Sequence, residues 1–376
     1  MADGAEENRA DNAIRLGVIG AGWFASRRHL PDAVAHPQIV LTALCRRDPD
    51  ARARLADHFG VAPENTFGDW RQMLDTVALD AVLITTPNYL HFEPAREALE
   101  RGLHVLIEKP MTIRSADARA LVALAQARNR RLAVALNPPF WAHCHRIRRA
   151  LGSVAMGGLE SASMYWTGSA AYLFGRAAPP EALPGLVPPT PFRADPAQNG
   201  GGYLIDGGSH LISELLWVTG LRARRVTALL DAIPTDMRAS LSIELSNGAV
   251  ASLTTIGDSQ LPVRRVRHVF GAEHGTVIVI GFEFETSINL HGQETQKFRE
   301  SDLAPVASPI ANFAEAIQGQ AELASPGEHG SHVVEVVEAA YESATTGRTV
   351  SIPEPSAGNA AIVASEGSRL EMKQVS

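Results

Sequence analysis

The chain has few of the residues that mark secreted or membrane proteins. Its 376 residues include only two cysteines, Cys45 and Cys144. That is too few for a disulfide framework and favours a reducing compartment. No apolar run approaches the roughly 18 residues that cross a bilayer, and the acidic, polar N-terminus is unlike a signal or transit peptide. We therefore expect a cytoplasmic protein with no membrane partner.

Excess positive charge is also missing. The formal net charge is −7, which argues against nucleic acid as a partner. We interpret the two basic clusters, 128–131 and 264–267, as solvated faces. Zinc-type cysteine or histidine spacing does not occur, and the side chains of 143–145 would diverge on a helix because they are direct neighbours. No metal site is expected.

The first part of the chain alternates strand and helix patterns. Regular alternation predicts right-handed crossovers and a doubly wound parallel sheet of the α/β class. We expect this Rossmann domain to span 14–136, after a disordered tail at 1–13. The predicted strands are 14–20, 39–45, 81–86, 103–107 and 132–136, and the predicted helices are 23–36, 49–59, 70–75, 92–101 and one capped by Ser115.

The second part, 137–353, is dominated by strand patterns. Adjacent strands predict an open, mostly antiparallel sheet in an α+β domain, and Asn247-Gly248 is a strong hairpin signal. A loop at 177–191 is long enough to be functional, and 354–376 is expected to be a disordered tail. The predicted strands are 159–165, 225–230, 239–245, 249–255, 268–270 and 276–280, with helices at 145–151, 211–218, 308–318 and 330–346.

A glycine-rich turn follows the first predicted strand. Gly20, Gly22 and Ala25 match the dinucleotide fingerprint, and Trp23 and Phe24 lie within it. The first glycine allows a tight turn, the second admits the pyrophosphate, and the small third residue permits close packing. The helix N-terminus then offers amides to the phosphates. This strand–turn–helix context predicts a nicotinamide dinucleotide cofactor.

Arginines follow the second strand, where an acidic residue would favour NAD. Arg46 takes that position, and Arg47 follows it. Two guanidinium groups suit a ribose 2′-phosphate, so we expect NADP(H) to be favoured over NAD(H). The alternative is that both arginines are solvated and Asp48 merely caps the next helix.

Two later strand ends carry polar groups. Ligands of an open parallel sheet bind outside the carboxyl ends of its strands. Thr86-Pro87-Asn88 should therefore line the cofactor crevice, with His91 nearby, although such a histidine is more often structural. Glu108-Lys109-Pro110 delivers a lysine to the place where cofactor and substrate would meet.

A second glycine-rich segment, 200–202, leads to Asp206 and His210. These two residues are four apart, so they share one face of a helical turn. A carboxylate near an imidazole favours the imidazolium and can orient the ring. The pair suits general acid/base chemistry, although a histidine beside an aspartate is often a helix-capping pair.

At this point the chain resembles the glucose–fructose oxidoreductase/inositol dehydrogenase (Gfo/Idh/MocA) family over roughly residues 14 to 353. The resemblance follows the family's order and spacing of motifs. The motifs are Gly20-x-Gly22-x-x-Ala25, Thr86-Pro87-Asn88 with His91, Glu108-Lys109-Pro110, Phe192-Arg193-x-Asp195, Gly200-Gly201-Gly202 with Asp206-x-x-x-His210, and Ala339-Ala340-Tyr341-x-Ser343-x-x-x-Gly347-Arg348.

The resemblance implies hydride transfer between nicotinamide and a carbinol carbon of a sugar, cyclitol or related molecule. By position, Lys109 would polarise the reacting oxygen, His210 would be the acid/base, and Asp206 would support both. Arg193 is a further candidate for substrate contact, whereas 137–141 lacks an arginine often found there. A homodimer or homotetramer is the family's habit, commonly through the second sheet.

Two other functional classes stay open. One is an enzyme that retains its cofactor and uses transient oxidation for elimination, epimerisation or glycoside cleavage. The other is a non-catalytic cofactor-binding regulator, against which the joint presence of Lys109, Asp206 and His210 argues. The sequence does not name the substrate.

Overall fold

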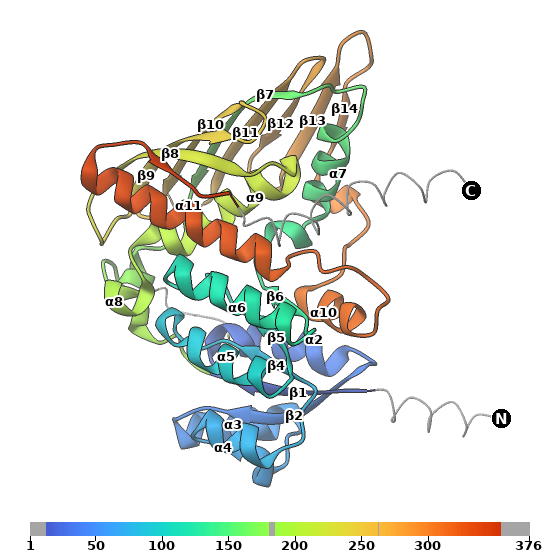
Figure 1. Ribbon diagram of the computed structural model, residues 1–376, viewed down its shortest axis with the longest axis vertical. Coiled ribbons are helices and arrows are strands. Elements are labelled where there is room, and N and C mark those ends of the chain that lie inside the picture. The colour runs from blue at the N-terminus through green and yellow to red at the C-terminus, as the bar shows by residue number, and fades with distance from the viewer. Residues whose placement is uncertain (1–12, 180–184, 262, 355–376) are drawn as a thin grey trace, which may run out of the picture.

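The computed structural model describes residues 13–179, 185–261 and 263–354. The tails expected to be disordered lie outside these residues, except for their innermost positions. The described chain forms two sheets, one above the other, with helices between them (Figure 1). Within the described ranges, no helix combines the length and apolarity needed to cross a membrane.

The first sheet is parallel throughout its described strands and has the order β3-β2-β1-β4-β5-β6. This arrangement confirms the predicted doubly wound sheet. The strand β3 was not predicted because it has two residues and no pattern of its own. The strands are β1 (Ile14–Ile19), β2 (Ile39–Cys45), β3 (Thr66–Phe67), β4 (Ala81–Ile84), β5 (His104–Ile107) and β6 (Leu132–Val134).

The helices around this sheet begin much as the sequence indicates. Asp48 caps α3 by accepting a hydrogen bond from the amide of Ala51 at 3.0 Å. Ser115 was expected to cap α6, and that is wrong: Arg114 is the N-cap, and the Ser115 hydroxyl contacts Glu338 instead. The helices are α2 (Leu30–Ala35), α3 (Pro49–Phe59), α4 (Trp70–Thr76), α5 (Phe92–Glu100) and α6 (Ser115–Ala127).

The second sheet has nine strands in the order β14-β13-β12-β11-β7-β10-β9-β8-β15. Of its described pairings, β7 with β10 is parallel and the others are antiparallel, as expected for a mostly antiparallel sheet. The strands are β7 (Leu159–Thr167), β8 (Ala223–Leu230), β9 (Arg238–Leu245), β10 (Val250–Ile256), β11 (Arg265–Ala272), β12 (Gly275–Ile280), β13 (Glu285–Leu290), β14 (Gln296–Phe298) and β15 (Val350–Ser351).

Strands β13 and β14 were not predicted from the sequence. Their residues, 285–290 and 296–298, are largely polar, so they lack the apolar alternation that indicates a strand. They are strands because β12 offers its free edge to β13, and β13 in turn pairs with β14. The predicted Asn247-Gly248 hairpin does join β9 and β10, with Gly248 at φ 89°.

Helices from the second half of the chain pack against both sheets. The helix α11 lies between β8 of the second sheet and α6 of the first unit (Figure 1). Residues of α11 such as Val333 belong to the same buried core as Val122 and Val226. The helices of this half are α7 (Ala142–Leu151), α8 (Pro196–Asn199), α9 (Ser209–Thr219), α10 (Pro309–Ile317) and α11 (Gly327–Thr346).

The helix α10 completes the core on the other side of the parallel sheet. Its Ile310 and Phe313 are buried in one cluster with Leu16 and Leu30. The sequence division at residue 136 therefore separates the two sheets, but it does not separate two independently packed cores.

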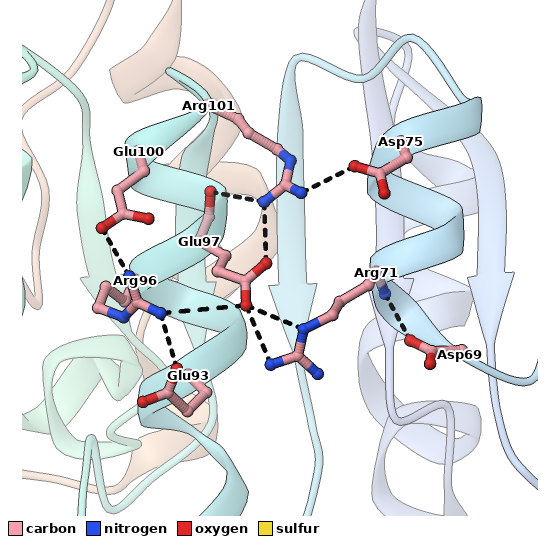
Figure 2. Close-up of polar contacts among 8 residues, drawn as sticks. All are labelled: Asp69, Arg71, Asp75, Glu93, Arg96, Glu97, Glu100 and Arg101. Atoms are coloured by element: carbon pink, nitrogen blue, oxygen red, sulfur yellow. Dashed lines mark hydrogen bonds and ion pairs between the residues drawn. The ribbon is translucent and has the colours of Figure 1, made fainter.

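A network of charged side chains joins α4 and α5 at the surface (Figure 2). Glu97 lies at its centre, and its carboxylate accepts hydrogen bonds from Arg71 and Arg101 at 3.0 Å each. Arg101 also donates to Asp75 at 2.8 Å. The Glu97 side chain is only 14% exposed, whereas most of its partners are more exposed. One carboxylate thus neutralises cations from two elements.

We predict that Glu97→Gln destabilises the protein by about 1 kcal/mol, since it removes the charge shared by Arg71, Arg96 and Arg101 while keeping the size of the side chain. The thermal unfolding midpoint should fall by roughly 2–4 °C. Glu93→Gln is the matched control, because Glu93 pairs with Arg96 and its side chain is 52% exposed. Equal shifts for the two variants would contradict a central role for Glu97.

Candidate active site

The glycine turn after β1 is packed against the end of β4. Gly20 has φ +84°, and a Cβ there would come within 2.7 Å of the Thr86 amide nitrogen. The Thr85 hydroxyl donates to the Gly20 carbonyl at 2.9 Å. A Cβ on Gly22 would meet its nearest described atom at 3.4 Å. Gly20 is therefore required by the fold itself, whereas the room beside Gly22 suits the approach of a phosphate.

The helical segment that follows this turn contacts Glu108, the residue before the predicted catalytic lysine. Its π-helical turn, Ala25–His29, buries His29, whose Nε2 lies 2.7 Å from Glu108 Oε1. The other carboxylate oxygen of Glu108 accepts from the Lys109 amide at 3.0 Å. Such π-helical turns are frequent at functional sites. Sequence reasoning missed His29 because no motif marks it.

The loop predicted to be functional returns to the glycine turn. A Cβ at Gly185 would come within 2.9 Å of Trp23 Cδ1, so the loop lies directly against that indole. Phe24, beside it, is 37% exposed. Residues 180–184 of the loop lie outside the described residues. The described part places Trp23 and the loop together at the mouth of the dinucleotide turn.

The predicted phosphate-binding arginines occupy different environments. Arg46 is half-buried and donates to the Ala21 carbonyl at 2.8 Å, so it also holds the glycine turn. Arg47 is exposed. Asp48, the nearest acidic residue, is used as the cap of α3. Arg46 and Arg47, rather than a free carboxylate, thus follow the end of β2.

The end of β4 is tied to both halves of the chain. Asn88 is buried, and its amide nitrogen donates to the backbone and side-chain oxygens of Asn199 at 2.9 Å each. His91 is 1% exposed, and its ring nitrogens contact the carbonyl oxygens of Thr86 and Pro110 at 2.9 and 2.8 Å. Both side chains are therefore buried and hold the chain at the end of β4 in place through hydrogen bonds within the protein.

Lys109, Asp206 and Arg193 meet in one buried ion cluster. Lys109 Nζ donates to Asp206 Oδ1 at 2.7 Å and to the Asp206 carbonyl at 3.1 Å. Arg193 Nε donates to the same Oδ1 at 3.0 Å. Burial alone would raise the pKa of Asp206, but the charges of Arg193 and Lys109 outweigh it and hold that pKa well below its usual range. The carboxylate therefore stays ionised and fixes both cations.

His210 lies beside this cluster but does not share its carboxylate. Asp206 makes no hydrogen bond to the ring among the described residues, and Nδ1 of the ring is buried without a partner there. Burial, followed by the charge of Lys109, lowers the pKa of His210 to about 3. The sequence had favoured an imidazolium, and that is wrong because burial and the cations outweigh Asp206. The site presents a neutral imidazole whose Nε2 is the nitrogen that can meet a ligand.

The backbone that carries Asp206 is anchored by residues remote in sequence. Asp236 is fully buried and accepts hydrogen bonds from the amides of Gly202 and Leu204 at 3.2 and 2.7 Å. The Tyr341 hydroxyl donates to Asp236 at 2.6 Å and accepts from the Gly202 amide at 3.0 Å. Neither contact has a sequence signal, because the three segments are joined only by the fold.

Arg264, in the basic cluster expected to be solvated, is exposed but lies near enough to the site to affect it. Arg264 is placed over the Trp166 ring, 5.4 Å from its centroid. Its charge is among those that lower the pKa of His210. Tyr203 is buried and begins the helical turn that carries Asp206.

The expected divergence of residues 143–145 is only half right. His145 does turn away, and its Nε2 contacts the Pro139 carbonyl at 2.9 Å. His143 Nε2 and Cys144 Sγ, however, lie 3.4 Å apart. The argument that these side chains could not share a ligand therefore fails for this pair.

Comparison with protein-family models assigns most of the chain. Residues 14–136 match the oxidoreductase family with an NAD-binding Rossmann fold. Residues 168–277 match the GFO/IDH/MocA C-terminal domain, and residues 265–352 match the oxidoreductase family's C-terminal alpha/beta domain. These matches follow the same two sheets that the structure shows.

Curated relatives are named as enzymes of sugars. A dTDP-3,4-didehydro-2,6-dideoxy-alpha-D-glucose 3-reductase of Streptomyces antibioticus is 37% identical over 115 residues, which are 31% of this chain and 34% of the relative. That match spans only about a third of the relative. The enzyme of the same name from Streptomyces violaceoruber is 30% identical over 70% of this chain and 68% of its own length. D-glucoside 3-dehydrogenase of Escherichia coli is 24% identical over 90% and 97%.

A solved structure of a levoglucosan dehydrogenase in complex with NADH has the same fold, with a TM-score of 0.75 and 21% identity over 91% of this chain and 100% of the other. The family models and the longer Streptomyces match confirm the resemblance that the motifs indicate. The chain belongs to the Gfo/Idh/MocA family of oxidoreductases, with an NAD-binding Rossmann fold in residues 14–136.

Proposed function

We propose that the chain is an NAD(P)-dependent oxidoreductase that transfers a hydride between nicotinamide and a secondary alcohol or ketone of a sugar-like molecule. The observation that carries this proposal is the neutral His210 beside the Lys109–Asp206–Arg193 ion cluster, at the carboxyl end of β5. Strand ends of this kind of sheet are where a cofactor and a substrate meet.

Each residue of the site has a chemical task in this reaction. A bound nicotinamide would supply the acceptor for the hydride, with its two electrons, from the carbinol carbon. His210 Nε2 takes the hydroxyl proton as the hydride leaves, and it needs a free lone pair to do so. Lys109 Nζ polarises the reacting oxygen and stabilises developing alkoxide charge. Asp206 keeps the ammonium in place. Reduction of a ketone uses the same groups in the opposite sense.

Position 3 of a sugar ring is the favoured reacting position. Two kinds of curated relative are named for that position, one as a 3-reductase and one as a 3-dehydrogenase. Arg193 and Arg264 add cationic donors around the base, which suits hydroxyl-rich or anionic sugars. The proposed substrate is accordingly a pyranose, free or carried on a larger group.

The proposed cofactor is NADP(H) in preference to NAD(H). Its support is the pair Arg46 and Arg47 after β2, together with the use of Asp48 as a helix cap rather than as a free ribose ligand. A 2′-phosphate there would be held by charge-assisted hydrogen bonds.

We also propose a cytoplasmic homodimer or homotetramer that associates through the second sheet. The face of this sheet opposite α9 and α11 carries exposed Leu229, Val250 and Ile280, at 77%, 55% and 54%. They share this face with polar side chains, among them Ser240, Thr254 and Arg267, so the proposed interface would be of mixed polarity.

The function is tested by following reduced-nicotinamide absorbance with NADP⁺ or NAD⁺ and a panel of pyranosides and nucleotide sugars. We expect stoichiometric reduction with at least one pyranoside. His210→Asn should lower kcat about 10²- to 10⁴-fold, since it removes the base, without changing cofactor affinity. His58→Asn, an exposed histidine on α3, is the control. Conversion without net absorbance change would indicate a retained cofactor, and unchanged kcat in His210→Asn would refute the assigned base.

The pH dependence follows from the lowered pKa of His210. Proton abstraction needs the neutral ring, and a group with a pKa of about 3 is neutral throughout the range from pH 5 to pH 8. The profile of kcat/KM for alcohol oxidation reports the free enzyme. It should therefore show no loss of activity near pH 6.5, the usual pKa of histidine. A tenfold fall in kcat/KM per pH unit below pH 6.5 would contradict the lowered pKa of His210.

Arg47 is the cleaner variant for the cofactor preference, because Arg46 also holds the Ala21 carbonyl. Arg47→Ala should raise the Kd of NADPH by about tenfold, the loss of one charged hydrogen bond. The Kd of NADH should stay within twofold. Arg149→Ala, an exposed arginine on α7, is the control. Equal weakening of NADPH and NADH in a fluorescence titration would overturn the preference.

A further inference from the structure

Four side chains with metal-binding atoms are buried together one helical turn beyond His210. His143 and Cys144 come from α7, Glu214 from α9 and His268 from β11. Their exposed fractions are 0%, 0%, 1% and 0%. The proposed hydride transfer uses none of them. Imidazole, thiolate and carboxylate together are a ligand set that Zn²⁺ and similar ions prefer.

The ligand atoms of three of these side chains lie close enough together to share one ion. The ligand atoms of His143, Cys144 and Glu214 all lie within 4.8 Å of one another. His143 Nε2 is 3.4 Å from Cys144 Sγ, and His268 Nε2 is 3.5 Å from Glu214 Oε2. Bonds of about 2.0–2.3 Å in a tetrahedron place neighbouring ligands roughly 3.3–3.6 Å apart. His143 and Cys144 therefore already have the spacing of two ligands of one ion, whereas His268 lies beside Glu214 and outside the group of three.

Two side chains of the cluster, Glu214 and His268, make no hydrogen bond among the described residues. Both carboxylate oxygens of Glu214 and both ring nitrogens of His268 are buried and make no hydrogen bond to any described residue. Buried polar groups are normally hydrogen-bonded, and a buried carboxylate is costly without a counter-charge. Glu214 Oε2 and His268 Nε2 lie 3.5 Å apart, at ion-pair distance. Glu214 Oε1 and His268 Nδ1 still have no partner among the described residues.

A second carboxylate orients His143 in the manner of a metal ligand. Glu300 Oε2 lies 2.5 Å from His143 Nδ1 and also accepts from the His143 amide at 2.8 Å. Nδ1 is thereby the donor, and the lone pair of Nε2 is directed toward Cys144. Histidine ligands almost always carry such a carboxylate or carbonyl partner on the other nitrogen. An ordinary buried ion pair of Glu214 with His268 does not require this arrangement.

We propose that His143, Cys144 and Glu214 bind a divalent ion of the Zn²⁺ class, with His268 lying beside Glu214. On binding, the thiol of Cys144 releases its proton to solvent and its sulfur becomes a thiolate ligand, with no change of oxidation state. The ion joins α7 and α9, and α9 also carries His210. The site is structural, because it is separate from the Lys109–Asp206–Arg193 ion cluster and its ligands are almost fully buried.

The test uses the full chain, stripped with a chelator and then titrated with Zn²⁺ or Co²⁺ under reducing conditions. We expect one ion per chain by elemental analysis and a thiolate-to-cobalt charge-transfer band. Cys144→Ser should abolish that band. Cys45→Ser should keep it, because Cys45 is the other buried cysteine and lies in the parallel sheet. Neither readout depends on enzymatic activity.

Glu300→Gln supplies a variant that should fold, since the side chain of Glu300 is 35% exposed. It should weaken Zn²⁺ binding about 10- to 100-fold, the usual effect of losing a partner of a ligating histidine. Absence of a stoichiometric ion and of the cobalt band in the unmodified chain would overturn the site, whatever the variants do. A band that survives in Cys144→Ser would overturn it as well.

Discussion

The buried ion pair between Lys109 and Asp206 is the contact on which the rest of the site depends. It joins the end of β5 in the parallel sheet to the helical turn before α9 in the other half. Taking two charges out of water is costly unless geometry and further hydrogen bonds compensate. Arg193 and the Asp206 carbonyl provide that compensation. The two halves must therefore meet in one register for the charges to be satisfied.

The same pair explains why a motif alone misjudges protonation. Asp206 and His210 look like a carboxylate–imidazole couple, yet the carboxylate is already shared by Lys109 and Arg193. The ring next to it feels those cations and its own burial, and its pKa falls to about 3. Residue types fix which groups can take part, whereas the surrounding charges decide which form each group adopts.

Local patterns carried most of the fold prediction. Strand periodicity and turn residues located β2 and α3 at their observed bounds, and the glycine fingerprint located the dinucleotide turn. Local patterns could not predict contacts between residues that lie far apart in the sequence. Asp236 and Tyr341 hold the segment before Asp206, and His29 meets Glu108 across 79 positions of sequence. The polar strands β13 and β14 were also missed, because an available sheet edge rather than their own pattern makes them strands.

The position of α10 and α11 has a consequence for how the chain is made. Their apolar faces complete cores that include strands near the N-terminus. A ribosome releases the first 136 residues long before these helices exist. Until α10 and α11 have been synthesised, the nascent parallel sheet exposes apolar surface. Such exposed surface is what chaperones bind. The dinucleotide-binding half is thus synthesised before the helices that complete its core.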